Sequence, residues 1–254
     1  RILALLGLAL AASLALLVGR ALLLRPQAGA AAPAARPALA DERAVVERLA
    51  AAIRIPTLSH QDPADDDPAA FQAFREHLER SYPALHAGLR RELVNERSLL
   101  YTWQGRDASL PGVVLMAHQD VVPVEPGTED GWEHPPFSGA VAGGFVWGRG
   151  TLDTKAKLTA ICEAVDLLAR EGFQPKRTTH LFFGHDEEVG GRAGALAAVE
   201  RFEAEGRRFD WVLDEGCTIA VGIVPGVARP VALIGIAEKG YLTLGLTATA
   251  EGGH

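Results

Sequence analysis

The stretch that most constrains the fold is residues 178–188, which read TTHLFFGHDEE. The β-forming side chains over residues 179–183 predict a buried strand, which ends at the following glycine. Asp186, Glu187 and Glu188 come next. Acids at the carboxyl end of an apolar strand are costly unless a cation lies there, and open α/β sheets bind ligands at these strand ends. The alternative is a charged, solvated loop.

Three more predicted strands end in residues that can bind a metal. They are His118 and Asp120 after residues 113–117, Asp153 after residues 146–150, and Asp214 and Glu215 after residues 211–213. Taken singly, such a histidine is usually a hydrogen-bonded loop residue, and Asp153 could simply cap a helix. Taken together, one imidazole and several carboxylates at one sheet edge form a ligand set that zinc accepts. Asp120 can orient the imidazole of His118 through its other ring nitrogen.

Helical patterns alternate with the strands. Apolar residues at helical spacing predict a helix capped by Asp41, and Asp67 followed by Pro68 predicts the start of a second helix. The remaining expected elements are helices within residues 151–172 and 193–204 and strands at 98–103, 231–236 and 242–249. Alternating strands and helices predict an α/β fold, with a mostly parallel sheet flanked by helices on both faces.

The first 24 residues are almost wholly apolar. They predict a membrane anchor or a cleavable signal peptide, because small residues at positions 28–30 offer a cleavage site. A buried helix is the alternative, but the Ala/Pro-rich residues 25–40 that follow are typical of a linker. We therefore expect the folded part to begin near residue 41 and to lie outside the cytoplasm, either membrane-anchored or secreted or periplasmic.

Charge and cysteine content narrow the functional class. The formal net charge is −7, and no stripe of lysine and arginine is present, which argues against nucleic acid as a partner. The two cysteines, Cys162 and Cys217, fit neither a disulfide framework nor a Cys-x-x-Cys metal site. Cys162 is on the apolar side of a predicted helix, where a packed thiol is expected.

Five ordered motifs resemble one enzyme family. They are HQDVVPV at 118–124, GWEHPPFSG at 131–139, GRGTLDTK at 148–155, GHDEEVGG at 184–191 and LDEG at 213–216. These motifs resemble the M20 family of dizinc metallopeptidases, and within it the branch of carboxypeptidase S and PM20D1, the N-acyl amino acid hydrolase/synthase. The resemblance covers roughly residues 41–254. Relatives commonly have Asp-Asp-Lys or Asp-Met-Lys-Gly where this chain has residues 153–156, Asp-Thr-Lys-Ala.

The resemblance implies roles for His118 and for five acids in the motifs. His118 and Asp214 would bind one Zn²⁺, Asp153 would bridge both ions, and Glu188 would bind the second. Glu187 would be the general base that takes a proton from the activated water. Asp120 would support His118.

The resemblance also implies a domain order. Residues 41–238 would be the first part of a catalytic domain, and residues 239–254 would begin an inserted lid and dimerisation domain. His254 resembles the lid histidine that, in family dimers, reaches the neighbouring subunit's site to polarise the scissile carbonyl. A homodimer through the lid is therefore expected for the full-length protein.

The expected function is zinc-dependent hydrolysis of an amide bond in a peptide or N-acyl amino acid that carries a free carboxylate. One alternative is a non-catalytic, membrane-tethered binding module on the same fold. The intact acids at 153, 187 and 188 argue against it, since a binder has no use for a base beside a ligand. A second alternative is a mononuclear aminopeptidase, which a count of zinc per chain would distinguish.

Overall fold

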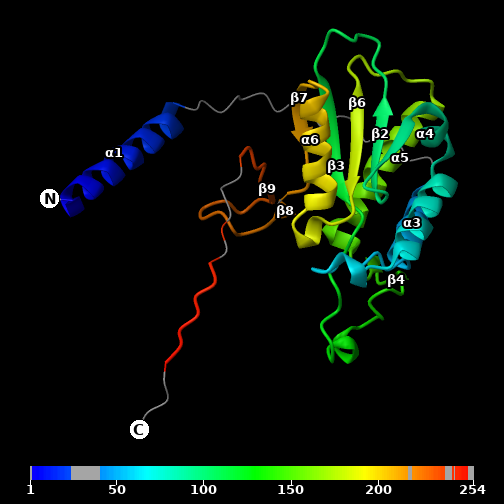
Figure 1. Ribbon diagram of the computed structural model, residues 1–254, viewed down its shortest axis with the longest axis horizontal. Coiled ribbons are helices and arrows are strands. Elements are labelled where there is room, and N and C mark those ends of the chain that lie inside the picture. The colour runs from blue at the N-terminus through cyan, green and yellow to red at the C-terminus, as the bar shows by residue number, and fades with distance from the viewer. Residues whose placement is uncertain (1, 24–40, 217–218, 238–241, 243, 251–254) are drawn as a thin grey trace. The chain divides into compact units, whose positions relative to one another are not determined.

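The computed structural model describes residues 2–23, 41–216, 219–237, 242 and 244–250 (Figure 1). The chain divides into two compact units, Arg1–Ala40 and Asp41–His254. The first unit contains one described helix, α1 (Ile2–Leu23). Among the described residues, no helix combines the length and apolar character needed to cross a membrane.

The second unit is built on a five-stranded sheet with the order β1-β2-β6-β3-β7. The strands are β1 (Arg90–Val94), β2 (Ser98–Trp103), β3 (Gly112–His118), β6 (Thr179–Gly184) and β7 (Phe209–Leu213). Strands β6, β3 and β7 run parallel, whereas β1 pairs antiparallel with β2 and β2 pairs antiparallel with β6. The sheet is thus mixed, and its parallel half carries the strand ends singled out in the sequence.

The β1–β2 connection explains the antiparallel half. Asn95 and Glu96 both have positive φ, 46° and 66°, as a tight hairpin turn requires. Such a turn returns the chain beside the strand it has just left, whereas a parallel neighbour needs a long crossover. The predicted α/β class with a mostly parallel sheet is confirmed, and β2 is the strand that runs opposite to the other four strands of this sheet.

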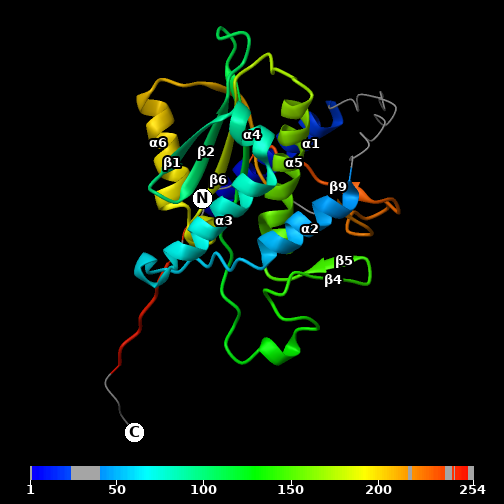
Figure 2. The same ribbon diagram turned by 90° about the vertical axis from the view of Figure 1, so that its right-hand side faces the viewer.

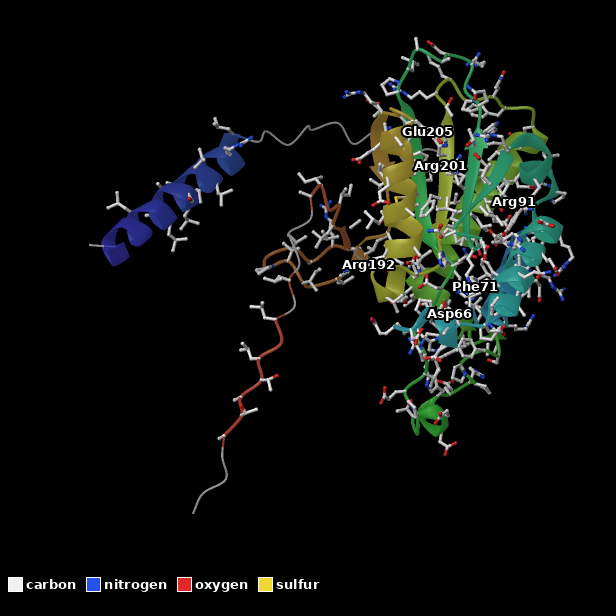
Figure 3. All side chains as sticks on the ribbon, in the orientation of Figure 1. Asp66, Phe71, Arg91, Arg192, Arg201 and Glu205 are labelled. Atoms are coloured by element: carbon white, nitrogen blue, oxygen red, sulfur yellow. The ribbon has the colours of Figure 1, made fainter. Side chains whose placement is uncertain are left out.

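Helices cover both faces of the sheet, as the side view shows (Figure 2). They are α2 (Glu42–Ile53), α3 (Pro68–Ser81), α4 (Pro83–Gly88), α5 (Ala156–Arg170) and α6 (Ala197–Ala204). Strand β6 contributes side chains to the hydrophobic core on both faces of the sheet, because successive side chains of a strand point to opposite faces. Leu181 and Phe183 join the core beneath α3, α4 and α5, together with Cys162, while Phe182 packs with Phe202 of α6.

Two helix starts follow the sequence closely. The Asp41 carboxylate accepts a hydrogen bond from the Ala44 amide at 3.0 Å, and the Asp67 carboxylate accepts one from the Ala69 amide at 2.9 Å. Each cap satisfies an amide that has no partner within its own helix. These two predictions are confirmed.

The strand predictions near the C-terminal end are less accurate. Only β9 (Val231–Ala232) forms within residues 231–236, where it pairs with β8 (Ile219–Ala220). Residues 242 and 244–249 have no regular structure, although a strand was expected there. A strand is stable only when a neighbour satisfies its backbone groups, and the described residues supply no neighbour for this stretch. The final expected site residue, His254, lies outside the described residues.

Candidate active site

The carboxyl ends of β3 and β6 meet at the lower edge of the sheet in Figure 1, and β7 runs in the same direction beside β3. His118 is the last residue of β3 and lies opposite Gly184, the last residue of β6. Strand β7 points toward the same edge but ends at Leu213, opposite Leu115, so the residues after Leu213 continue the chain toward His118. The parallel register therefore places the acids that follow β6 and β7 beside the histidine that ends β3.

His118 is buried, and its Nε2 atom faces a group of carboxylates. Nε2 lies 2.9 Å from an oxygen of Asp153, 3.6 Å from one of Glu215 and 3.7 Å from one of Glu187. Two groups of possible metal ligands result, His118 with Asp153 and Glu188, and His118 with Glu187 and Glu215. Within each group the ligand atoms lie within 4.8 Å of one another.

Asp153 reaches this point through a tight turn after the short hairpin of β4 (Ala140–Ala142) and β5 (Phe145–Trp147). Gly150 has a φ of 84°, a backbone conformation that is strained for any residue with a side chain. A Cβ at this position would also lie only 2.4 Å from the Val121 side chain. The turn continues into an irregular segment, Thr151–Lys155, before α5 begins at Ala156. The helix expected within residues 151–172 is α5, which begins only after the chain has bent to present Asp153.

Asp120 holds the other side of the imidazole. The Nδ1 atom of His118 donates a hydrogen bond to the Asp120 backbone carbonyl at 2.9 Å and lies 3.4 Å from the Asp120 carboxylate. The same carboxylate is fully buried and accepts hydrogen bonds from the amides of Glu187 and Glu188, at 3.2 and 3.1 Å, and from the hydroxyl of Ser59, at 2.7 Å. Asp120 thus fixes which nitrogen of His118 faces the acids.

Asp214 lies apart from both ligand groups. It lines a cavity of about 510 Å³ together with His118 and Glu187, but its carboxylate faces Lys157, 3.9 Å from the ammonium nitrogen. Glu215 takes the place near His118. Glu215 is among the possible ligands that the sequence offers after residues 211–213, but the family resemblance assigns the ligand role to its neighbour Asp214. The assignment of Asp214 as a ligand stays a prediction.

The close approach of several acids to His118 shifts the pKa values of the groups in this cluster. Burial raises the pKa of Glu188 to about 7, and the neighbouring Asp153 adds to the effect. Burial also raises the pKa of Glu187 and of Glu215, with His118 opposing the rise in both. Burial alone would lower the pKa of His118, but the Asp120 carboxylate and the other acids raise it to about 10. Mutually repelling acids around one imidazole are typical of a functional site.

The donor set suits a zinc ion. Ligand atoms about 2.0–2.1 Å from zinc in tetrahedral geometry lie roughly 3.3 Å apart. The distances of 2.9, 3.6 and 3.7 Å from Nε2 to its carboxylate neighbours bracket that separation. The Nδ1 bond to Asp120 leaves Nε2 as the metal-facing atom, which is the usual arrangement around a metal-binding histidine. The residues present therefore fit the metal.

Known proteins match the chain over the same region. The family model "Peptidase family M20/M25/M40" matches residues 114–235. The N-fatty-acyl-amino acid synthase/hydrolase PM20D1 of Xenopus tropicalis is 38% identical over 216 residues, which cover 84% of this chain and 41% of that protein. Carboxypeptidase S of Saccharomyces cerevisiae is 41% identical over 222 residues, covering 82% and 37%. The chain thus spans about two fifths of the length of the curated relatives it matches.

Solved structures agree on the fold. An M20 family metallo-carboxypeptidase from Sulfolobus solfataricus, Sso-CP2, superposes with a TM-score of 0.56 at 20% sequence identity, covering 70% of this chain and 38% of that one. The matched relatives are enzymes, named as carboxypeptidases and hydrolases. The chain therefore carries a domain of peptidase family M20/M25/M40, in agreement with the family that its five motifs resemble.

Proposed function

We propose that the protein hydrolyses an amide bond with the help of zinc, on a peptide or N-acyl amino acid that carries a free carboxylate. The observation that supports this most directly is the convergence of His118 Nε2 with the carboxylates of Asp153, Glu187 and Glu188 at one strand edge. Asp120 holds the opposite nitrogen of the same ring. A binding module of this fold would not need a free carboxylate beside such a ligand group.

Each residue has a distinct part in this proposal. His118, Asp153, Glu188 and Asp214 would hold two Zn²⁺ ions, which would supply water of lowered pKa and stabilise charge on the substrate oxygen. Glu187 would accept the proton of the attacking water and return it to the leaving amine. Its raised pKa suits this exchange, because a general base works best when its pKa approaches the working pH.

The substrate class is proposed from the relatives. One relative is named for an N-fatty-acyl-amino acid and the other is a carboxypeptidase, and both kinds of substrate present an amide next to a free carboxylate. The cavity of about 510 Å³ beside His118 and Glu187 is large enough for an amino acid residue, within the range of roughly 300–1,000 Å³ for ligand sites.

Two further parts of the proposal rest on sequence. We propose that the folded unit works outside the cytoplasm, because residues 1–24 are apolar and precede a linker-like stretch. We also propose a homodimer through the lid, in which His254 stabilises the oxyanion of the neighbouring subunit's reaction. Light scattering would test the dimer, and loss of turnover in His254→Ala, rescued by mixing with Glu187→Gln subunits, would test the shared site.

The decisive experiment is Glu187→Gln in the whole protein, assayed on dipeptides and N-acyl amino acids. Turnover should disappear while zinc content is retained, because in this proposal His118, Asp153, Glu188 and Asp214 hold the ions and Glu187 acts only as the base. Glu200→Gln, an exposed change on α6, is the matched control and should leave turnover unaltered. Unchanged turnover in Glu187→Gln would refute the general base, and one zinc per chain would indicate a mononuclear enzyme instead.

A further inference from the structure

Residues 57–59, between α2 and α3, run directly alongside the loop that follows His118. Leu58 forms a parallel bridge with Val121. The Val121 amide donates to the Thr57 carbonyl at 2.9 Å, and the Ser59 amide donates to the Val121 carbonyl at 3.3 Å. The segment 57–59 is therefore paired, backbone to backbone, with the loop carrying Asp120, although more than one helix and strand separate them in sequence.

Side chains of the same segment add two more bonds to this loop. The Thr57 hydroxyl donates to the Gln119 carbonyl at 2.5 Å, and the Ser59 hydroxyl donates to the Asp120 carboxylate at 2.7 Å. Thr57 is fully buried and Ser59 is 3% exposed, so water does not compete for these bonds. Hydroxyl bonds to a buried carboxylate are about twice as strong as neutral ones.

Asp120, held in place by Ser59, in turn contacts His118, Glu187 and Glu188. The oxygen that accepts from Ser59 also accepts from the Glu188 amide, and the second oxygen accepts from the Glu187 amide. The second oxygen also faces the Nδ1 atom of His118 at 3.4 Å. The orientation of one buried carboxylate thus sets both the imidazole and the turn of Glu187 and Glu188.

We propose that segment 57–59 is a positioning segment for the metal site and that Ser59 is its principal positioning residue. This inference rests on the proposed metal-dependent function. Ser59 touches no ligand atom and acts through Asp120. Without the Ser59 hydroxyl, Asp120 loses a donor and can rotate about its side-chain bonds. His118 and the Glu187–Glu188 turn are then no longer held in fixed positions by the same carboxylate, which weakens metal binding.

The experiment measures Zn²⁺ affinity of the whole protein, by competition with a chelator, in Ser59→Ala, Ser59→Thr and Thr57→Val. Thr102→Val is the matched control for Thr57→Val. Thr102 is also buried and its hydroxyl lies 3.2 Å from His180 Nδ1, toward the opposite end of β6. The unfolding temperature of each metal-free variant is measured in parallel, so that lost stability and lost affinity are separated.

We expect Ser59→Ala to weaken zinc binding roughly 10- to 100-fold, the range found when partners of metal ligands are removed. Thr57→Val should weaken it less, Ser59→Thr should restore it, and Thr102→Val should lower stability without changing affinity. Affinity equal to wild type in Ser59→Ala would overturn the inference. If Ser59→Ala does not fold, the inference is tested on Thr57→Val instead. A zinc affinity of Thr57→Val equal to that of Thr102→Val would overturn it. A wild-type protein that binds no zinc would instead refute the proposed function itself.

Discussion

The ammonium nitrogen of Lys155 lies 2.6 Å from the backbone carbonyl oxygen of Ile55, and Lys155 is fully buried. It also donates to the Ala52 carbonyl at 3.1 Å and lies 4.9 Å from the centre of the Phe74 ring. Carbonyls at a helix C-terminus have no partners within the helix, and a cation there also complements the helix dipole. Lys155 therefore ties the turn carrying Asp153 to the end of α2.

Lys155→Met should destabilise the folded unit by about 1–3 kcal/mol, because the Ala52 and Ile55 carbonyls each lose the hydrogen bond from the ammonium group. Methionine keeps the apolar stem of the side chain, so the loss reports the ammonium group. Urea unfolding with a constant m-value measures the change. Lys176→Met, at an exposed lysine, is the control and should be near neutral. Equal stability of the two variants would contradict the role given to Lys155.

Glu163 of α5 forms a partly buried ion pair with Arg48 of α2. Its carboxylate accepts hydrogen bonds from two nitrogens of Arg48, at 2.5 and 2.8 Å, and from the Tyr82 hydroxyl at 3.1 Å. Arg48→Met would leave the carboxylate buried without its cation, at a cost of about 2–4 kcal/mol. The double variant Arg48→Met with Glu163→Gln should recover part of this loss. A double-mutant cycle that shows additive losses would contradict the pairing.

His180 should make stability depend on pH. Burial lowers its pKa to about 4, and Arg207 and Arg90 add to the effect against the opposing Glu205 and Glu92. An unfolded histidine titrates near pH 6.5, about as in model peptides. Between about pH 6.5 and 4 the unfolded chain therefore binds a proton that the folded chain does not, and stability falls as the pH is lowered.

The measurement is the free energy of unfolding from pH 7 to 4, with and without His180→Gln. The variant should show a shallower loss of stability over this interval, since its side chain does not titrate. His77, whose pKa burial also lowers to about 4, contributes in the same direction and remains in both proteins. Parallel pH curves for the two proteins would show that His180 is not buried in its neutral form.

Gly150→Ala should damage the site specifically. Its φ of 84° already disfavours a side chain, by roughly 1–2 kcal/mol, and the added carbon would press on Val121. Gly127→Ala is the control, because its φ is 83° and no atom lies within 4 Å of the added carbon. Both should lose stability, but only Gly150→Ala should lose zinc affinity, measured by chelator competition. Equal zinc affinities would place the Asp153 turn outside the metal site.

Local patterns predicted much of this fold. The Asp41 and Asp67 caps, the β6 strand and the packed thiol of Cys162 each depend on a few neighbouring residues, so the sequence carries the signal directly. The meeting of His118 with the Glu187–Glu188 turn could also be expected, because parallel strands end at one edge. Asp153 was expected at the same sheet edge, but it follows β5, which belongs to a separate two-stranded sheet, so the turn after β5 brings it to His118.

Other features depend on contacts between distant residues. The bond from Ser59 to Asp120 joins residues 61 positions apart, and no pattern around Ser59 indicates it. The placement of Glu215 rather than Asp214 beside His118 depends on side-chain orientation next to Lys157. The strand expected at 242–249 failed for a related reason, since propensity alone does not supply a partner strand.

The two outer strands of the sheet differ in chemistry. Strand β1 presents Arg90, Arg91 and Glu92, which pair with one another or with neighbouring helices. Strand β7 presents Trp211, Val212 and Leu213, each about half exposed. Charged margins discourage the addition of a further strand, whereas an apolar margin favours it. A further strand, from this polypeptide or from another molecule during aggregation, would therefore add beside β7 rather than beside β1.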